Sequence, residues 1–295
     1  MSDFRLKVFQ SVAKNLSFTK ASQELFVSQP AITKHIQELE ATYQTRLFDR
    51  QGSKISLTES GRLLLEHCER ILEDYKRLEY EMHVLHNEYI GELKLGASTT
   101  IAQYVLPPLL GSFIGKFPQV NLSLLNGNSR EIEAALQEHR IDLGLVEGVF
   151  RLPNLKYTTF LEDELVAVVH SKSRLQLPEE ITPQDLPAIP LVLRERGSGT
   201  LDVIERSLQK HGVKLSSLHV LMYLGSTESI KLFLENSDCM GIVSIRSICK
   251  ELAAGTFRVV EIKDMPMLRD FCFVQLQGQE GGLSQAFMNY MFMSR

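Results

Sequence analysis

Hydrophobic and polar residues follow helical spacing through the first forty residues, and they predict three helices in succession. The first spans residues 3–14, and the second runs from the cap Ser17 to about Phe26. The third begins at the cap Ser28 and carries Pro30 in its first turn, where an amide has no intrahelical partner to lose. The inward positions of these helices are Leu6, Val8, Phe9, Val12, Ala13, Ala21, Leu25, Ile32, Ile36 and Leu39.

A hairpin and one long helix are predicted next. Two short apolar stretches flank the turn over residues 51–54, and from Thr58 to about Tyr89 there is no proline and one glycine, Gly61, in the first turn. The apolar positions of the long helix repeat every seven residues, which favours a coiled-coil seam with a partner helix over an intramolecular surface. The residues expected to form this dimerisation seam are Leu64, Ile71, Tyr75, Leu78, Met82 and Leu85, with Cys68 and Tyr89 on the same stripe.

Beyond Gly91, short apolar strands alternate with amphipathic helices to the end of the chain. Strands are expected at GELKLGAS, VNLSLLNG, IDLGLVEG, ELVAVVH, IPLVLRER, HVLMYLG, MGIVS, FRVVEI and DFCFVQLQ. One helix is expected over residues 101–117, after the first strand. This alternation predicts an α/β body with largely parallel sheets, of a size that suits two lobes with a cleft between them.

Composition and charge narrow the class of protein. With 44% hydrophobic and 23% charged residues the chain resembles an ordinary soluble globular protein, and it has no apolar run of membrane-spanning length and no signal peptide, so we expect it in the cytoplasm. Residues 1–60 hold eight Lys or Arg against six Asp or Glu, which is a charge of +2. The net charge of the chain is −4, so the remaining residues carry −6. A mildly basic head on an acidic body is compatible with nucleic acid at one end only. The four cysteines lie far apart and predict free thiols.

Helix, tight turn, helix and hairpin make a winged helix-turn-helix layout, in which the start of the second helix meets base edges in the major groove. Here that start holds Gln29, Pro30, Thr33 and Lys34. Glutamine can pair with adenine, proline and threonine carbons can meet a thymine methyl, and lysine can bind guanine or phosphate. Ser28 and the helix N-terminus would hold a phosphate. On spacing alone, a merely solvated helix face is an equal alternative.

The sequence from 18 to 50, FTKASQELFVSQPAITKHIQELEATYQTRLFDR, with LTESGRLLLEHCERIL after it, closely resembles the DNA-binding head and linker helix of the LysR-type transcriptional regulators. The matching positions include Ala21, Ser28, Gln29, Pro30, Ala31, Ile36, Leu39, Leu47, Phe48, Arg50, Leu57, Thr58 and Gly61. The body matches less strictly but in order, at the strand over 92–98, at IDLGLVEG and at GSTESIKLFLENSDCMGIVS. The resemblance covers most of the chain and implies a sequence-specific regulator of transcription.

The resemblance also implies the fold and the domain organisation. Residues 1–58 would form the winged helix-turn-helix domain, 59–90 the linker dimerisation helix, and 91–295 a two-lobed, periplasmic-binding-protein-like (type 2) α/β effector domain. Its lobe I would comprise about 91–163 and 269–295, and its lobe II about 164–268. In the family two linker helices pair, two such dimers form a tetramer, and an effector changes the relation between the lobes.

Residue roles follow from the same resemblance. The DNA-binding residues would be Ser28, Gln29, Pro30, Thr33, Lys34, Arg50 and Lys54. The family often has serine at 33 and arginine at 34, and lysine lacks the bidentate fork of arginine, so the base preference at 34 stays open. The effector-binding residues would be Ser98, Thr99, Thr100, Glu147, Gly148, Ser198, Gly199, Thr200 and Thr227.

These effector positions lie at helix starts, where hydroxyls and free amides suit an anion, so a small carboxylate or inorganic oxyanion is the hypothesis. The alternative is that each Ser or Thr at these positions only caps its own helix and binds no ligand. The RGSGT segment resembles the family branch that regulates sulphur assimilation and carbon fixation, but the charge of Glu147 disfavours an inorganic anion, and the identity of the effector stays open.

The alternative function is an α/β enzyme or small-molecule-binding protein with an accessory DNA-binding head. RGSGTLD has Asp202 where GxGxxG needs its third glycine, and the sequence has no GxxxxGK[ST], GxSxG or HExxH motif. His83 and His86 lie three apart on the long helix without an acidic or cysteine neighbour at ligand spacing. The sequence therefore favours a regulator that binds double-stranded DNA and a small effector, with no catalytic residue, metal or cofactor.

Overall fold

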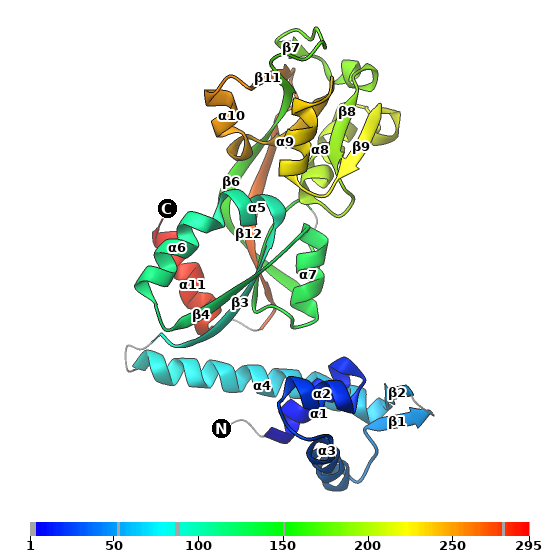
Figure 1. Ribbon diagram of the computed structural model, residues 1–295, viewed down its shortest axis with the longest axis vertical. Coiled ribbons are helices and arrows are strands. Elements are labelled where there is room, and N and C mark those ends of the chain that lie inside the picture. Colours follow the sequence, from blue (N-terminus) through cyan, green and yellow to red (C-terminus); the bar gives the residue numbers. More distant parts are fainter. Residues whose placement is uncertain (1–3, 52–53, 86–88, 150, 279–280, 295) are drawn as a thin grey trace. The chain divides into compact units, whose positions relative to one another are not determined.

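The computed structural model describes residues 4–51, 54–85, 89–149, 151–278 and 281–294 (Figure 1). The chain divides into two compact units, Met1–Glu88 and Tyr89–Arg295. Across the described residues, none of the helices combines the length and the apolar character needed to cross a membrane.

The first unit begins with the three predicted helices, α1 (Phe4–Asn15), α2 (Phe18–Glu24) and α3 (Gln29–Tyr43). Both predicted caps form, because the Ser17 hydroxyl accepts from the Lys20 amide and the Ser28 hydroxyl accepts from the Ala31 amide. The antiparallel strands β1 (Phe48–Gln51) and β2 (Lys54–Leu57) follow as the predicted hairpin. This confirms the winged helix-turn-helix layout.

A small hydrophobic core holds this unit together. Its buried members are Leu6, Val8, Phe9, Val12, Ala13, Phe18, Ala21, Ile32, Ile36, Leu39, Leu47, Phe48, Cys68 and Leu72. Phe48 in the hairpin lies 5.5 Å from the ring of Phe9 and 5.9 Å from that of Phe18, so the wing is packed against α1 and α2. The predicted inward residues are buried, except that Leu25 is only partly so.

The long helix α4 (Glu59–Leu85) packs against the head along its N-terminal part and exposes apolar residues further along. Its N-terminal part belongs to the core of the head, where Cys68 is buried with its thiol 3.3 Å from the carbonyl oxygen of Leu6. Cys68 is therefore a core residue, and including it in the stripe for a partner helix was wrong. Further along, Ile71, Leu78 and Met82 are 39%, 52% and 52% exposed, so the apolar stripe continues on a surface that the head does not cover.

The second unit is built on a mixed sheet of order β4-β3-β5-β12-β6-β10-β8-β9, with β11 pairing β6 and β7 pairing β11. The strands are β3 (Gly91–Ser98), β4 (Val120–Gly127), β5 (Leu143–Glu147), β6 (Leu155–His170), β7 (Glu180–Ile181), β8 (Leu191–Arg194), β9 (Val220–Leu224), β10 (Met240–Ser244), β11 (Phe257–Ile262) and β12 (Met267–Leu276). The prediction of a largely parallel sheet is wrong at its middle. There β6 and β12 are antiparallel to each other, and each is antiparallel to its other neighbours β5, β10 and β11.

The long strands β6 and β12 connect two lobes (Figure 1). Lobe I contains β3, β4 and β5, and lobe II contains β8, β9, β10 and β11. Separate cores lie on either side of the connection, one around Phe113, Phe273 and Phe287 in lobe I and one around Leu193 and Ile204 in lobe II. This confirms the two-lobed α/β fold.

Helices cover the sheet of each lobe. Lobe I has α5 (Thr99–Tyr104), α6 (Leu106–Lys116), α7 (Ser129–Gln137) and α11 (Gly282–Met293), and lobe II has α8 (Gly199–Lys210), α9 (Thr227–Glu235) and α10 (Cys249–Ala253), with short 3-10 helices at Pro183–Ala188, Leu215–Ser217 and Ile245–Ser247. The single helix predicted over 101–117 is two helices that meet at Val105. Pro107 and Pro108 have no amide to continue α5, and both fit the first turn of α6.

Candidate functional site

The start of α3 presents a polar surface on the head. Ser28, Gln29, Pro30 and Lys34 are exposed and Thr33 is half-buried, while the opposite face of the helix enters the core. The Thr33 hydroxyl donates to the Gln29 carbonyl oxygen over 3.1 Å, and the Thr19 hydroxyl of α2 is 3.4 Å from the Gln29 side-chain oxygen. The side chains of Arg50, Lys54, His83 and Leu85, and the whole of His86, lie outside the described residues.

In the second unit the sequence-predicted effector residues gather where the two lobes meet. Ser98, Thr99 and Thr100 start α5 and Glu147 ends β5 in lobe I, while Ser198, Gly199, Thr200 and Thr227 start α8 and α9 in lobe II, and the structure buries all of them. Gly148 has a φ of +132°, and a Cβ there would lie 3.3 Å from the Cα of Gly199. Thr227 sits further along, next to the Ser226 cap of α9.

The hydroxyls of this site do not share one role. Ser198 is a helix cap, because its oxygen accepts from the Thr200 amide over 3.2 Å. Ser98 is not, since it donates to the carboxylate of Glu147. Thr99 donates to the Gly127 carbonyl oxygen over 3.1 Å. Thr100 is 1% exposed and its hydroxyl has no hydrogen-bond partner among the described residues, which is an uncommon and costly state for a buried polar group.

Charged residues that the sequence analysis missed lie beside these hydroxyls. Arg269 of β12 is buried and donates to Asp163 of β6 over 2.8 Å and to the Thr200 hydroxyl over 2.9 Å. Its Nη1 also lies 3.5 Å from Glu147. The carboxylate of Glu147 is therefore compensated by an arginine and a hydroxyl. A charged residue inside an apolar strand, as in LEDELVAVV and LRDFCFVQL, was the available signal, but pairing across the sheet cannot be inferred from spacing.

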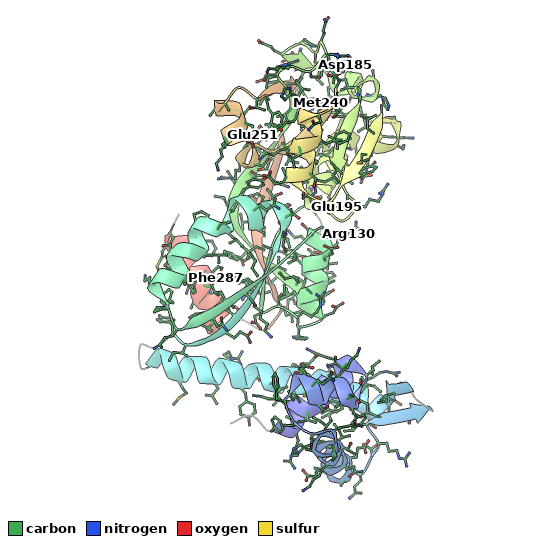
Figure 2. The ribbon with its side chains drawn as sticks, viewed as in Figure 1. Arg130, Asp185, Glu195, Met240, Glu251 and Phe287 are labelled. Carbon is green, nitrogen blue, oxygen red and sulfur yellow. The ribbon has the colours of Figure 1, made fainter. Side chains whose placement is uncertain are left out.

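Arg194 is a second buried arginine that the sequence analysis missed. It ends β8 in lobe II, and its Nη2 donates to the hydroxyl of Thr99 in lobe I over 3.4 Å. It is paired with its neighbour Glu195, with Nε 2.8 Å and Nη2 3.1 Å from the carboxylate oxygens. Figure 2 shows Glu195 at the edge of lobe II that faces Arg130 on α7. There the Arg130 amide donates to the Gly197 carbonyl oxygen over 3.3 Å.

A further contact between the lobes joins α5 to α9. The hydroxyl of Tyr104 donates to the carboxylate of Glu228, which also accepts from Lys231 over 2.9 Å. Burial and this hydrogen bond raise the pKa of Tyr104. Burial alone would raise the pKa of Glu228, but the hydrogen bonds from Tyr104 and Lys231, with the charge of Lys231, outweigh it and lower that pKa. Lys231 lies 2.5 Å from Glu251, so a hydrogen-bonded chain holds the lobes together here.

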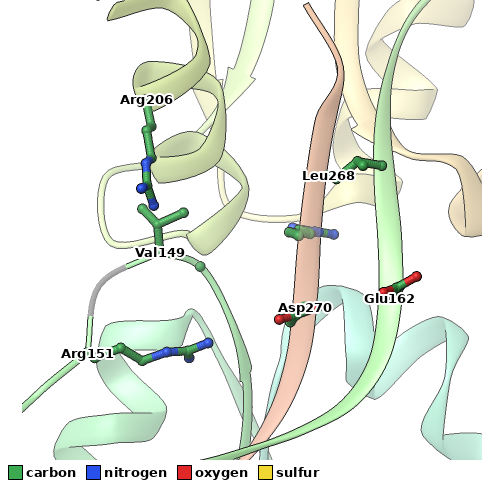
Figure 3. Close-up of a pocket in the computed structure, with 8 residues that line it drawn as sticks. Val149, Arg151, Glu162, Arg206, Leu268 and Asp270 are labelled. Carbon is green, nitrogen blue, oxygen red and sulfur yellow. The ribbon is translucent and has the colours of Figure 1, made fainter. Parts of the chain in front are cut away.

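Cavities border the junction of the lobes. One of about 310 Å³ is lined by Thr99, Gln103, Asn126, Gly127, Asn128, Glu131, Glu195, Gly225 and Ser226, from both lobes. Another of about 330 Å³ is lined by Gly148, Val149, Arg151, Glu162, Arg206, Leu268, Arg269 and Asp270 (Figure 3). Figure 3 shows Arg206 and Val149 on one side of this second cavity and the strand with Leu268 and Asp270 on the other.

Comparison with known proteins agrees with this architecture. Residues 4–62 match the family described as "Bacterial regulatory helix-turn-helix protein, lysR family", and residues 86–292 match the "LysR substrate binding domain". The chain is 34% identical to the HTH-type transcriptional regulator YeiE of Escherichia coli K12 over 88% of this chain and 85% of that one. It is 29% identical to the HTH-type transcriptional regulator CysL of Bacillus subtilis over 91% and 89%.

Among solved structures, the regulatory domain of Synechocystis PCC6803 CcmR in complex with 2-PG is similar to the second unit. It is 28% identical with a TM-score of 0.62, and the match covers 69% of this chain and 97% of that domain. The winged helix-turn-helix head, the two-lobed body and both family matches lead to one conclusion. The chain belongs to the LysR family of DNA-binding transcriptional regulators and carries the effector-binding domain of that family.

Proposed function

We propose that this regulator is controlled by a small anionic effector, a carboxylate or an inorganic oxyanion, which binds where the two lobes meet. The observation that carries the proposal is the Thr100 hydroxyl, which is buried beside helix starts and has no partner in the part of the chain that the structure describes. A ligand oxygen would give this hydroxyl its missing hydrogen bond, and the amides at the start of α8 would add donors and a favourable dipole.

The charge of Glu147 does not oppose an anion as strongly as its sequence position suggests. Its carboxylate already accepts from Ser98 and lies 3.5 Å from Arg269, so an incoming anion meets a compensated group. The other candidate contacts are Thr99, Gly148, Ser198, Gly199 and Thr200, with Thr227 at the start of α9. The complex of the related CcmR domain with 2-PG supports a small ligand in this kind of domain.

For DNA we propose that residues 1–58 form the DNA-binding domain and that Gln29, Pro30, Thr33 and Lys34 meet bases, with Ser28, Arg50 and Lys54 on phosphates. Residues 59–90 would pair two chains through the exposed stripe of α4, and residues 91–295 would bind the effector. Two-fold symmetry then places two recognition helices on half-sites of an inverted repeat. Two such dimers would form a tetramer in the cytoplasm.

The variant Thr100→Val tests the effector proposal. Valine keeps the shape of threonine and removes a hydroxyl that has no partner, so we expect the melting temperature to stay the same or to rise. Affinity for sulfate, phosphate or the small carboxylate that stabilises the wild type in a thermal-shift screen should fall about tenfold. Operator binding without ligand should not change. Equal anion affinities of the two proteins by calorimetry would reject the site.

A further inference from the structure

Arg194 has a donor that nothing in the described structure accepts. The side chain is 1% exposed, and its Nε and Nη2 donate to Glu195, while Nη2 also reaches the Gly225 carbonyl oxygen over 3.2 Å. Its Nη1 is buried without a hydrogen-bond partner. Because a buried donor on a charged group loses its hydration, a native structure normally gives it an acceptor from the protein, from water or from a ligand.

A second unpartnered atom lies on α5, the helix that Arg194 contacts through Thr99. Gln103 is one helical turn after Thr99 on the same face of α5, and Arg194 is hydrogen-bonded to Thr99. The Oε1 of Gln103 is also buried, and no described residue is its hydrogen-bond partner. Gln103 lines the cavity of about 310 Å³. The cavity is also lined by the three residues that Arg194 bonds, namely Thr99, Glu195 and Gly225.

The charges around this cavity decide which chemical group fits it. Glu195 already compensates Arg194, and Glu131 adds another carboxylate to the lining, so a second acidic group is disfavoured. Asn126, Asn128 and Ser226 supply the remaining polar surface. A hydroxyl group both accepts and donates, so one hydroxyl can accept from Nη1 of Arg194 and donate to Oε1 of Gln103. With the Gln103 amide turned over, the same hydroxyl accepts from its nitrogen.

We propose that the effector is a hydroxylated acid whose hydroxyl group binds Arg194 and Gln103. This inference rests on the proposed anionic effector, whose acid group would bind at Thr100 and the start of α8. The hydroxyl extends from there toward the cavity at the junction. Since Gln103 belongs to lobe I and Arg194 to lobe II, the hydroxyl adds a contact between the lobes that exists only when the ligand is bound, and it shifts the equilibrium toward the closed arrangement.

Matched ligand pairs test this inference by calorimetry on the full chain. The probes are malate against succinate and glycerate against propionate, with erythritol as a neutral polyol. The wild type should bind the hydroxylated acid of a pair about tenfold more tightly, because the acid without the hydroxyl leaves a charged donor unpaired. Gln103→Leu and Arg194→Lys should reduce this preference to within about twofold. Gln209→Leu, on an exposed position of α8, should retain it.

The possible results separate the hydroxyl contact from the anionic effector. Equal affinities within each pair for the wild type, or a preference that survives in both variants, overturns the hydroxyl contact and leaves the anionic effector in place. Erythritol binding that is lost in Gln103→Leu, with no acid bound, supports the hydroxyl contact and rejects the anionic effector. Absence of binding for all five probes overturns both. Gln103→Leu removes an unsatisfied acceptor, so its folding should be intact, and a wild-type melting temperature verifies this.

Discussion

Gly199 allows the two lobes to approach each other, and Gly199→Ala should hold them apart. A Cβ at this position would lie 2.0 Å from the carbonyl oxygen of Glu147 and 2.5 Å from its carbonyl carbon. That oxygen is fixed, because Glu147 pairs with Phe271 in the sheet and accepts from the Ser129 hydroxyl over 2.8 Å. Gly199 itself begins α8 without a left-handed φ, so alanine suits its backbone and only the contact across the junction is affected.

The magnitude follows from that overlap. Ordinary contact needs about 3.4 Å or more, so the start of α8 has to move away from β5 by about 1.4 Å. Overpacking of this kind costs about 1–3 kcal/mol. If the lobes open to avoid it, the closed arrangement becomes about 5- to 150-fold less populated relative to the open one. Effector affinity falls by the same factor wherever the closed arrangement is the binding form.

Hydrogen exchange followed by mass spectrometry measures this opening in the full chain. We expect faster exchange in Gly199→Ala for the peptides that contain residues 198–200 and Gly148, and unchanged exchange in the lobe cores. Gly111→Ala is the matched control, because nothing lies within 4 Å of a Cβ there and alanine favours the helix α6. Identical exchange at the junction in Gly199→Ala and wild type would refute the argument that this glycine permits closure.

Two further predictions concern the head and the linker helix. Gln29→Ala should weaken binding to a specific operator by about 1–3 kcal/mol at fixed salt while non-specific binding is retained, because a base contact and not a phosphate contact is lost; an unchanged footprint would contradict the assignment of the recognition helix. Leu78→Arg places a charge on the exposed stripe of α4, and we expect it to lower the molecular mass measured by light scattering to that of smaller assemblies. The same mass as the wild type would show that the stripe is not an interface.

Local elements could be predicted from the sequence because their causes are local. The N-termini of α2 and α3 are set by Ser17 and Ser28, whose hydroxyls cap the first turn of each helix. The strands β3, β4 and β10 have the bounds that their apolar runs predict. The break at Val105 was also accessible from the two prolines that follow it. Spacing favoured one helix there only because the apolar pattern continues across the break.

Long-range pairing could not be predicted in the same way. The antiparallel centre of the sheet depends on β6 and β12 meeting across more than a hundred residues, and a hydrophobic run does not specify its neighbours. The candidate site shows the same limit. Thr100 was predicted because the family resemblance marks its position and it begins a helix, whereas Arg194 and Arg269 lie in strands and have their contacts with partners on other strands and helices.

Because α4 packs into the core of the head, the helix and the head move together as one rigid unit. Gly61 approaches the Leu47 carbonyl oxygen so closely that a Cβ would lie 2.1 Å from it, and Cys68 and Leu72 are buried in the same core. The 27 residues of α4 span about 40 Å. In the proposed dimer, a tilt of about 5° between two paired α4 helices would therefore displace the recognition helix by about 3.5 Å, close to the rise of one base pair. A rotation this small would be enough to move one recognition helix of that dimer out of register with its half-site.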